Sequence, residues 1–149
     1  MAEKRPSTTL LWLTIVAAPG ALGLETGLRL LLFPDDFQLI REFLNPMLTP
    51  VAWGFAVVAG LGAALGLVIQ RRLIEKRIAK LPAEHSTRER RFQIAFGVFL
   101  LTTAIPQIPS IFSTFCFTFG ASIVPVIVSI TLTSVGVVGQ ALRVPKLAD

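Results

Sequence analysis

The feature that most constrains this fold is the division of the chain into four long apolar blocks. They cover residues 10–33, 50–70, 92–119 and 123–142. A helix of about 20 residues is long enough to cross a hydrocarbon core about 30 Å thick. The mean hydropathy is +0.71, so a water-soluble chain of this size would need far more polar surface. The sequence therefore predicts a single all-α, polytopic membrane domain over residues 1–149, with four transmembrane helices.

A patterned polar stretch separates the first two blocks. Apolar residues recur at helical spacing between Phe37 and Met47, and polar residues occupy the other face. We expect a short amphipathic helix over residues 35–45 that lies on the membrane surface. Asn45-Pro46 should end this helix, because the residue before a proline is displaced from helical dihedral angles. An ordinary ordered loop is the alternative.

Positive charge is concentrated between the second and third blocks. Residues 71–91 contain eight Lys or Arg against three Glu. Basic loops stay in the cytoplasm, so this pattern predicts a multi-pass protein of the plasma or inner membrane with both termini cytoplasmic. A patch for anionic lipid or a partner protein is the more specific interpretation. Its members would be Arg71, Arg72, Lys76, Arg77, Arg88, Arg90 and Arg91.

Two charges lie inside the first block. Glu25 and Arg29 are four residues apart with the acid first, the order that favours an ion pair within a helix. If the span covers the whole block, Glu25 is a carboxylate buried in hydrocarbon, which in membrane proteins indicates a functional site. If the helix leaves the bilayer at Arg29, both charges lie near the interface and the pair is structural.

Polar or small residues also recur at helical spacing in the last two blocks. The stripe of the third block is Thr103, Gln107, Ser110, Thr114 and Thr118, and that of the fourth is Ser129, Thr133, Gly136 and Gln140. Two such stripes on consecutive antiparallel spans should face each other, as a helix-packing seam or as a hydrated path. Pro106 and Pro109 interrupt the third block, where we expect a kink or a break. The candidate intramembrane polar site comprises Glu25, Arg29, Gln107, Ser110, Thr114, Ser129 and Thr133.

Small residues mark the second block as a helix-packing segment. In lipid, stripes of such residues let helix backbones approach closely. We therefore expect this span to contact another helix, in a homo-oligomer or with other membrane subunits. The packing residues are Ala56, Gly60, Gly62, Ala64 and Gly66.

The inventory of reactive side chains argues against several classes of protein. Haem and zinc are bound mainly by His, Cys or Tyr side chains. The chain has one cysteine, one histidine that lies in the basic loop, and no tyrosine, so it has too few ligands for either group inside the membrane. A Ser–His–Asp triad lacks an intramembrane histidine, and no Walker-type phosphate loop occurs. We therefore expect no cofactor, no metal, no catalytic residue set and no nucleic-acid partner.

These patterns support one functional interpretation and two alternatives. The first is a non-enzymatic integral membrane protein that acts as an oligomerising or accessory subunit of a membrane complex. The second is a small ion- or solute-transporting protein, in which Glu25, Arg29 and the polar seam between the third and fourth spans form the path. The weakest is a lipid-modifying enzyme that uses the same groups.

Overall fold

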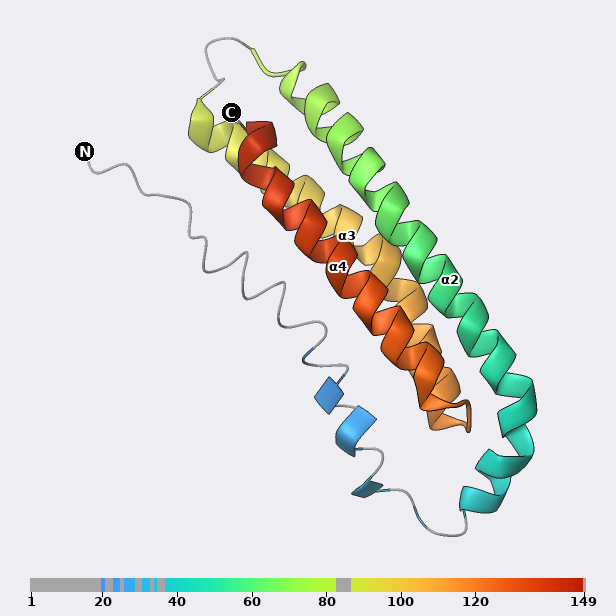
Figure 1. The fold of residues 1–149 in the computed structure, drawn as a ribbon. Helices are drawn as coiled ribbons and strands as arrows, with labels where there is room; N and C mark the ends of the chain where they lie inside the picture. Colours follow the sequence, from blue (N-terminus) through green and yellow to red (C-terminus); the bar gives the residue numbers. More distant parts are fainter. Residues whose placement is uncertain are drawn as a thin grey trace.

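The computed structural model contains three long helices that lie side by side as a bundle (Figure 1). They are α2 (Phe37–Ile78), α3 (Arg88–Thr118) and α4 (Ile123–Ala148), and each is antiparallel to the next along the chain. Every pair of these helices is in contact. The structure describes residues 37–82 and 87–148, together with positions 20, 23, 24, 26–28, 31, 32 and 34.

All three helices are long and apolar enough to cross a membrane. With 42, 31 and 26 residues, they are about 63, 46 and 39 Å long, against a hydrocarbon core of about 30 Å. Large aliphatic side chains such as Leu61, Leu101 and Val135 cover the outside of the bundle. The expected helical character is thus confirmed, with three helices that are long and apolar enough to span a membrane. The first expected span, residues 10–33, lies largely outside the described residues, so the count of four stays a prediction.

The second expected span is part of a longer helix. α2 begins at Phe37 and continues through Pro46 and Pro50, so the expected end of a separate surface helix at Asn45-Pro46 is wrong. The prolines remove two backbone hydrogen bonds, which bends a helix when its surroundings hold it together. Figure 1 shows the first turns of α2 at an angle to the rest, reaching toward the turn between α3 and α4.

The third and fourth expected spans match α3 and α4 closely. α3 is continuous through Pro106 and Pro109, so the alternative of a broken helix is wrong. A continuous helix is favoured in lipid because backbone groups left unpaired there cost several kcal/mol each. α4 extends past the expected end at residue 142 to Ala148, with Pro145 inside it.

The two ends of the bundle differ in composition. The turn end contains residues 119–122, which join α3 to α4, and the first turns of α2. The basic end contains the last turns of α2 and α4 and the first turn of α3. Among the described residues, the acidic ones at the basic end are Glu75 and Glu89. The basic residues described at that end are Arg71, Arg72, Lys76, Arg77, Lys80, Arg88, Arg90, Arg91, Arg143 and Lys146.

The interior changes in side-chain size along the bundle. Near the basic end the core contains larger residues, among them Ile74, Phe99 and Val144. Toward the turn end the face of α2 that is buried consists mainly of alanines and glycines. A Cβ added to Gly136 of α4 would lie 2.5 Å from the Cβ of Ala63 in α2, so these backbones are in close contact. Small residues therefore bring the three helices together in the membrane segment.

Candidate functional site

The structure brings part of the expected polar site into the bundle interior. Ser110 and Thr114 of α3 and Ser129 and Thr133 of α4 are buried, whereas Gln107 is half-buried. Glu25 and Arg29 lie outside the described residues. The four hydroxyl residues therefore form the part of the expected site whose geometry can be described.

The face of α3 that meets α4 is rotated from the expected stripe. Thr133 of α4 donates to the backbone oxygen of Pro106, at 3.1 Å. Thr103, a member of the expected stripe, donates to Leu100 of its own helix instead. The inward row of α3 thus passes through Thr102, Pro106 and Ser110.

One polar side chain from each helix meets in the half of the bundle nearer the basic end. We call Gln70, Thr102 and Gln140 the amide cluster, and all three are at most 1% exposed. Gln70 Nε2 donates to the backbone oxygen of Gln140 at 3.0 Å, which ties α2 to α4. Thr102 Oγ1 lies 2.8 Å from Gln140 Oε1, which ties α3 to α4. In hydrocarbon such contacts are retained because water cannot replace them.

The prolines of α3 leave two carbonyls without their usual helical donor, and glycines of α2 face both. Pro106 cannot donate to Thr102, and Pro109 cannot donate to Ile105. A Cβ at Gly66 would lie 3.5 Å from the Thr102 oxygen, and one at Gly62 would lie 3.3 Å from the Ile105 oxygen. The glycines therefore let the backbone of α2 cover these carbonyls, where weak Cα–H···O contacts become possible.

Several buried polar atoms in the described interior have no hydrogen-bond partner. They include the hydroxyls of Ser110, Ser113 and Ser129. The contacts Thr102–Gln140 and Pro106–Thr133 set the antiparallel register, which places Ser110 level with Ser129. Gln70 Oε1 and Gln140 Nε2, an acceptor and a donor, are also unpaired.

Sequence reasoning missed two members of the amide cluster. Gln70 ends the expected second span, where a polar residue is interpreted as a boundary. Thr102 is adjacent to the expected stripe and is not a member of it. Gln140, the third member, belongs to the stripe expected in the fourth block with Ser129 and Thr133.

The expected helix-packing residues are used mainly within the chain. Ala56, Gly62 and Gly66 are buried against α3 and α4. Gly60 is half-buried, with Leu132 next to it, and Ala64 is exposed. Contacts inside the bundle thus occupy most of this stripe.

The residues of the expected basic patch lie at the end of α2 and the start of α3. Arg71, Arg72, Lys76 and Arg77 are exposed on α2, and Arg88 and Arg90 are exposed on α3, whereas Arg91 is half-buried. Arg71 Nε contacts Glu75 Oε1 at 2.8 Å.

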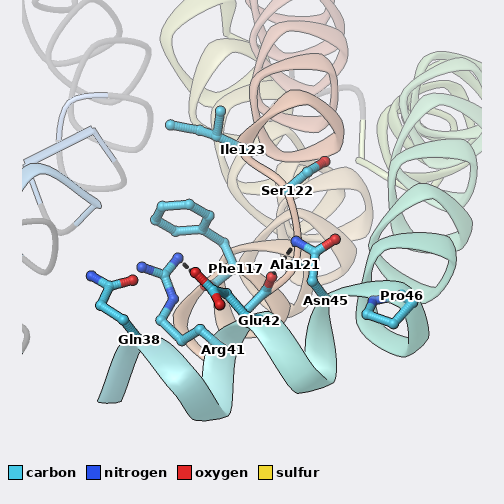
Figure 2. Close-up of a pocket in the computed structure, with 10 residues that line it drawn as sticks. Gln38, Arg41, Glu42, Asn45, Pro46, Phe117, Ala121, Ser122 and Ile123 are labelled. Carbon is cyan, nitrogen blue, oxygen red and sulfur yellow. Dashed lines mark hydrogen bonds between the residues drawn. The ribbon is translucent and has the colours of Figure 1, made fainter. Parts of the chain in front are cut away.

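A groove of about 540 Å³ opens at the turn end (Figure 2). Arg41 Nη2 donates to the backbone oxygen of Phe117 at 3.2 Å, and its guanidinium lies 5.0 Å from the centre of the Phe117 ring. Asn45 Nδ2 donates to the backbone oxygen of Gly120 at 2.7 Å. The first turns of α2 are therefore bonded to the end of α3. The groove is lined by Gln38, Arg41, Glu42, Asn45, Pro46, Phe117, Gly120, Ala121, Ser122 and Ile123.

The fold defines an all-helical chain compatible with a multi-pass membrane protein. Comparison with protein-family models, curated proteins and solved structures finds no match. Within the described residues, no three His, Cys, Asp or Glu side chains gather as a possible metal site. Function is therefore inferred from the helix contacts, the buried polar groups and the two ends of the bundle.

Proposed function

We propose that this chain is a non-enzymatic membrane protein that acts as an accessory subunit, binding other membrane helices through its lipid-facing surface. The observation that supports this proposal most directly is how the interior polar groups are used. Thr102, Thr133 and Gln70 each bond to a neighbouring helix. Groups used in this way stabilise the bundle, as expected of a structural protein.

Two outward-facing glycines support binding of a further helix. Nothing in the described structure lies within 4 Å of a Cβ added to Gly54 of α2 or Gly97 of α3. Glycine in a helix costs about 1 kcal/mol relative to alanine, and packing against Gly62, Gly66 and Gly136 offsets this cost inside the bundle. At Gly54 and Gly97 the same benefit requires a helix outside the three described here.

The proposal can be tested by measuring the mass of the particle extracted from native membranes without detergent. We expect a particle heavier than one chain in the wild type. Gly54→Leu with Gly97→Leu should reduce that mass without lowering the unfolding midpoint, because both positions face open space and leucine favours a helix more than glycine does. Val135→Leu is the matched control, since it enlarges an outward side chain that is already 67% exposed.

A particle of one chain in the wild type contradicts the proposal. That result would indicate that the expected first span of the same chain packs against Gly54 and Gly97. An unchanged mass in the double glycine variant would also contradict the role given to Gly54 and Gly97.

A second function, transport of a small ion or solute, is supported by the unpaired hydroxyls of Ser110, Ser113 and Ser129. Buried polar atoms normally have a partner, and water in a polar seam would supply one. The test is flux into liposomes that contain the purified protein. Transport predicts flux that falls in Ser110→Ala with Ser129→Ala and is abolished in Glu25→Gln, whereas the subunit proposal predicts no flux.

A further inference from the structure

The groove at the turn end has apolar walls and a polar rim. Phe117, Pro46 and Ile123 contribute apolar surface, and Gln38, Arg41 and Glu42 contribute polar groups. Figure 2 shows these polar side chains on the first turns of α2, facing the chain between α3 and α4. A ligand that fits must therefore combine an apolar body with a charged end.

The position of the groove relative to the spans indicates where such a ligand comes from. α3 ends at Thr118 and α4 begins at Ile123, so a bundle that crosses a membrane would place the groove where hydrocarbon meets the headgroups. The same turns of α2 expose Leu39, Phe43 and Met47, each more than half exposed. An apolar face of this kind is typical of a helix segment at the membrane interface.

The rim carries one charge of each sign on adjacent residues. The Arg41 guanidinium is fixed by its contacts with Phe117, and the exposed Glu42 side chain lines the same groove. Guanidinium groups complement phosphate, and carboxylates complement primary ammonium groups. The groove therefore matches a headgroup that has both charges.

We propose that this groove binds the headgroup of a phospholipid with a primary ammonium, such as phosphatidylethanolamine. Arg41 attracts the phosphate, Glu42 accepts from the ammonium, and the exposed side chains of Pro46 and Ile123 contact the glycerol and the first acyl carbons. A choline headgroup has no N–H to donate, and a glycerol headgroup leaves Glu42 beside a net negative lipid. The site thus prefers ethanolamine over both.

The experiment is native mass spectrometry of the full chain, titrated with phosphatidylethanolamine, phosphatidylcholine or phosphatidylglycerol. We expect the wild type to bind the ethanolamine lipid in preference. Glu42→Gln should lower its preference over the choline lipid about threefold, which is the size of effect that an exposed ion pair supports. Glu42 makes no contact that holds the helices together in the described structure, so the variant should fold normally.

Three further variants make the test specific. Arg41 also contacts Phe117, so two variants at this position are compared: Arg41→Lys, which keeps a cation, should bind all three lipids more tightly than Arg41→Gln, because each lipid has a phosphate. Glu89→Gln, an exposed carboxylate at the basic end, is the matched control and should leave the preference unchanged. The proposal is overturned if Glu42→Gln keeps the wild-type preference, or if phosphatidylglycerol binds the wild type best. Neither outcome bears on particle mass, so the subunit proposal is tested separately.

Discussion

At the scale of single residues, a match between two prolines and two glycines explains how α2 and α3 approach so closely. Pro106 and Pro109 expose carbonyl oxygens on α3, and Gly62 and Gly66 place backbone rather than side chains against them. In water such carbonyls would be hydrated. In lipid, a neighbouring backbone is the available cover.

Replacing Gly62 should separate these helices. We expect Gly62→Leu to lower the free energy of unfolding by about 1–3 kcal/mol, because the side chain has no space beside Ile105 and Pro106. Unfolding by sodium dodecyl sulfate in mixed micelles, followed by circular dichroism, measures this change. Gly97→Leu enlarges a position with open space around it and should be at least as stable as the wild type. Equal stability of the two variants would refute the close contact.

The amide cluster predicts a smaller effect. Gln140→Leu removes the interhelical partner of Thr102, which keeps acceptors in its own helix, and should cost about 1 kcal/mol, in the range measured for hydrogen bonds between membrane helices. The same unfolding measurement applies. Thr131→Val is the control, because the Thr131 hydroxyl bonds to Ile127 of its own helix and faces outward. A Gln140→Leu protein as stable as the control would show that the cluster does not hold the helices together.

At the scale of helices, the start of α2 is where local sequence and tertiary contacts disagree. Asn45-Pro46 and Thr49-Pro50 locally predict a break, yet Asn45 bonds to Gly120, and Thr49 accepts from the Ser122 N–H at 3.0 Å. These contacts join residues more than 70 positions apart in the sequence. Local patterns cannot include them, so the helical path through both prolines was not predictable.

Within the α3–α4 turn, Gly120 is the residue at which a side chain would disturb these contacts most. Its φ of 126° is strained for other residues, and a Cβ there would lie 2.5 Å from the Arg41 oxygen. We expect Gly120→Ala to cost at least about 1–3 kcal/mol and to release the first turns of α2. Hydrogen exchange should then rise over residues 37–49 and stay low over residues 60–70. Unchanged exchange at residues 37–49 would show that the turn does not hold this segment.

Prediction from sequence was most accurate where hydropathy alone sets the structure. Both ends of the third expected span lie within a few residues of the ends of α3, and the expected start of the fourth span is the start of α4. The charged residues before α3 and the turn at Gly120 mark these boundaries in the sequence. The face of α3 that contacts α4 could not be predicted in the same way. Rotation about a helix axis depends on three-way packing, which placed Thr102 inward and left Gln107 half-buried.

At the scale of the whole molecule, charge is separated along the bundle. The described part of the chain places ten Lys or Arg at the basic end, whereas the turn end has Arg41 and Glu42. With three spans between residues 37 and 148, the loop after α2 and the end of α4 share one side, and the α3–α4 turn lies on the other. The positive-inside rule would make the basic end cytoplasmic.

The most direct test of this account is the accessibility of single cysteines to a membrane-impermeant maleimide in intact cells. Cys116→Ala provides a cysteine-free background, into which Lys80→Cys, Ser122→Cys or Lys146→Cys is introduced. We predict labelling from outside only for Ser122→Cys, with the other two labelled after the membrane is opened. Labelling of Lys80→Cys and Ser122→Cys from the same side would contradict a bundle that crosses the membrane.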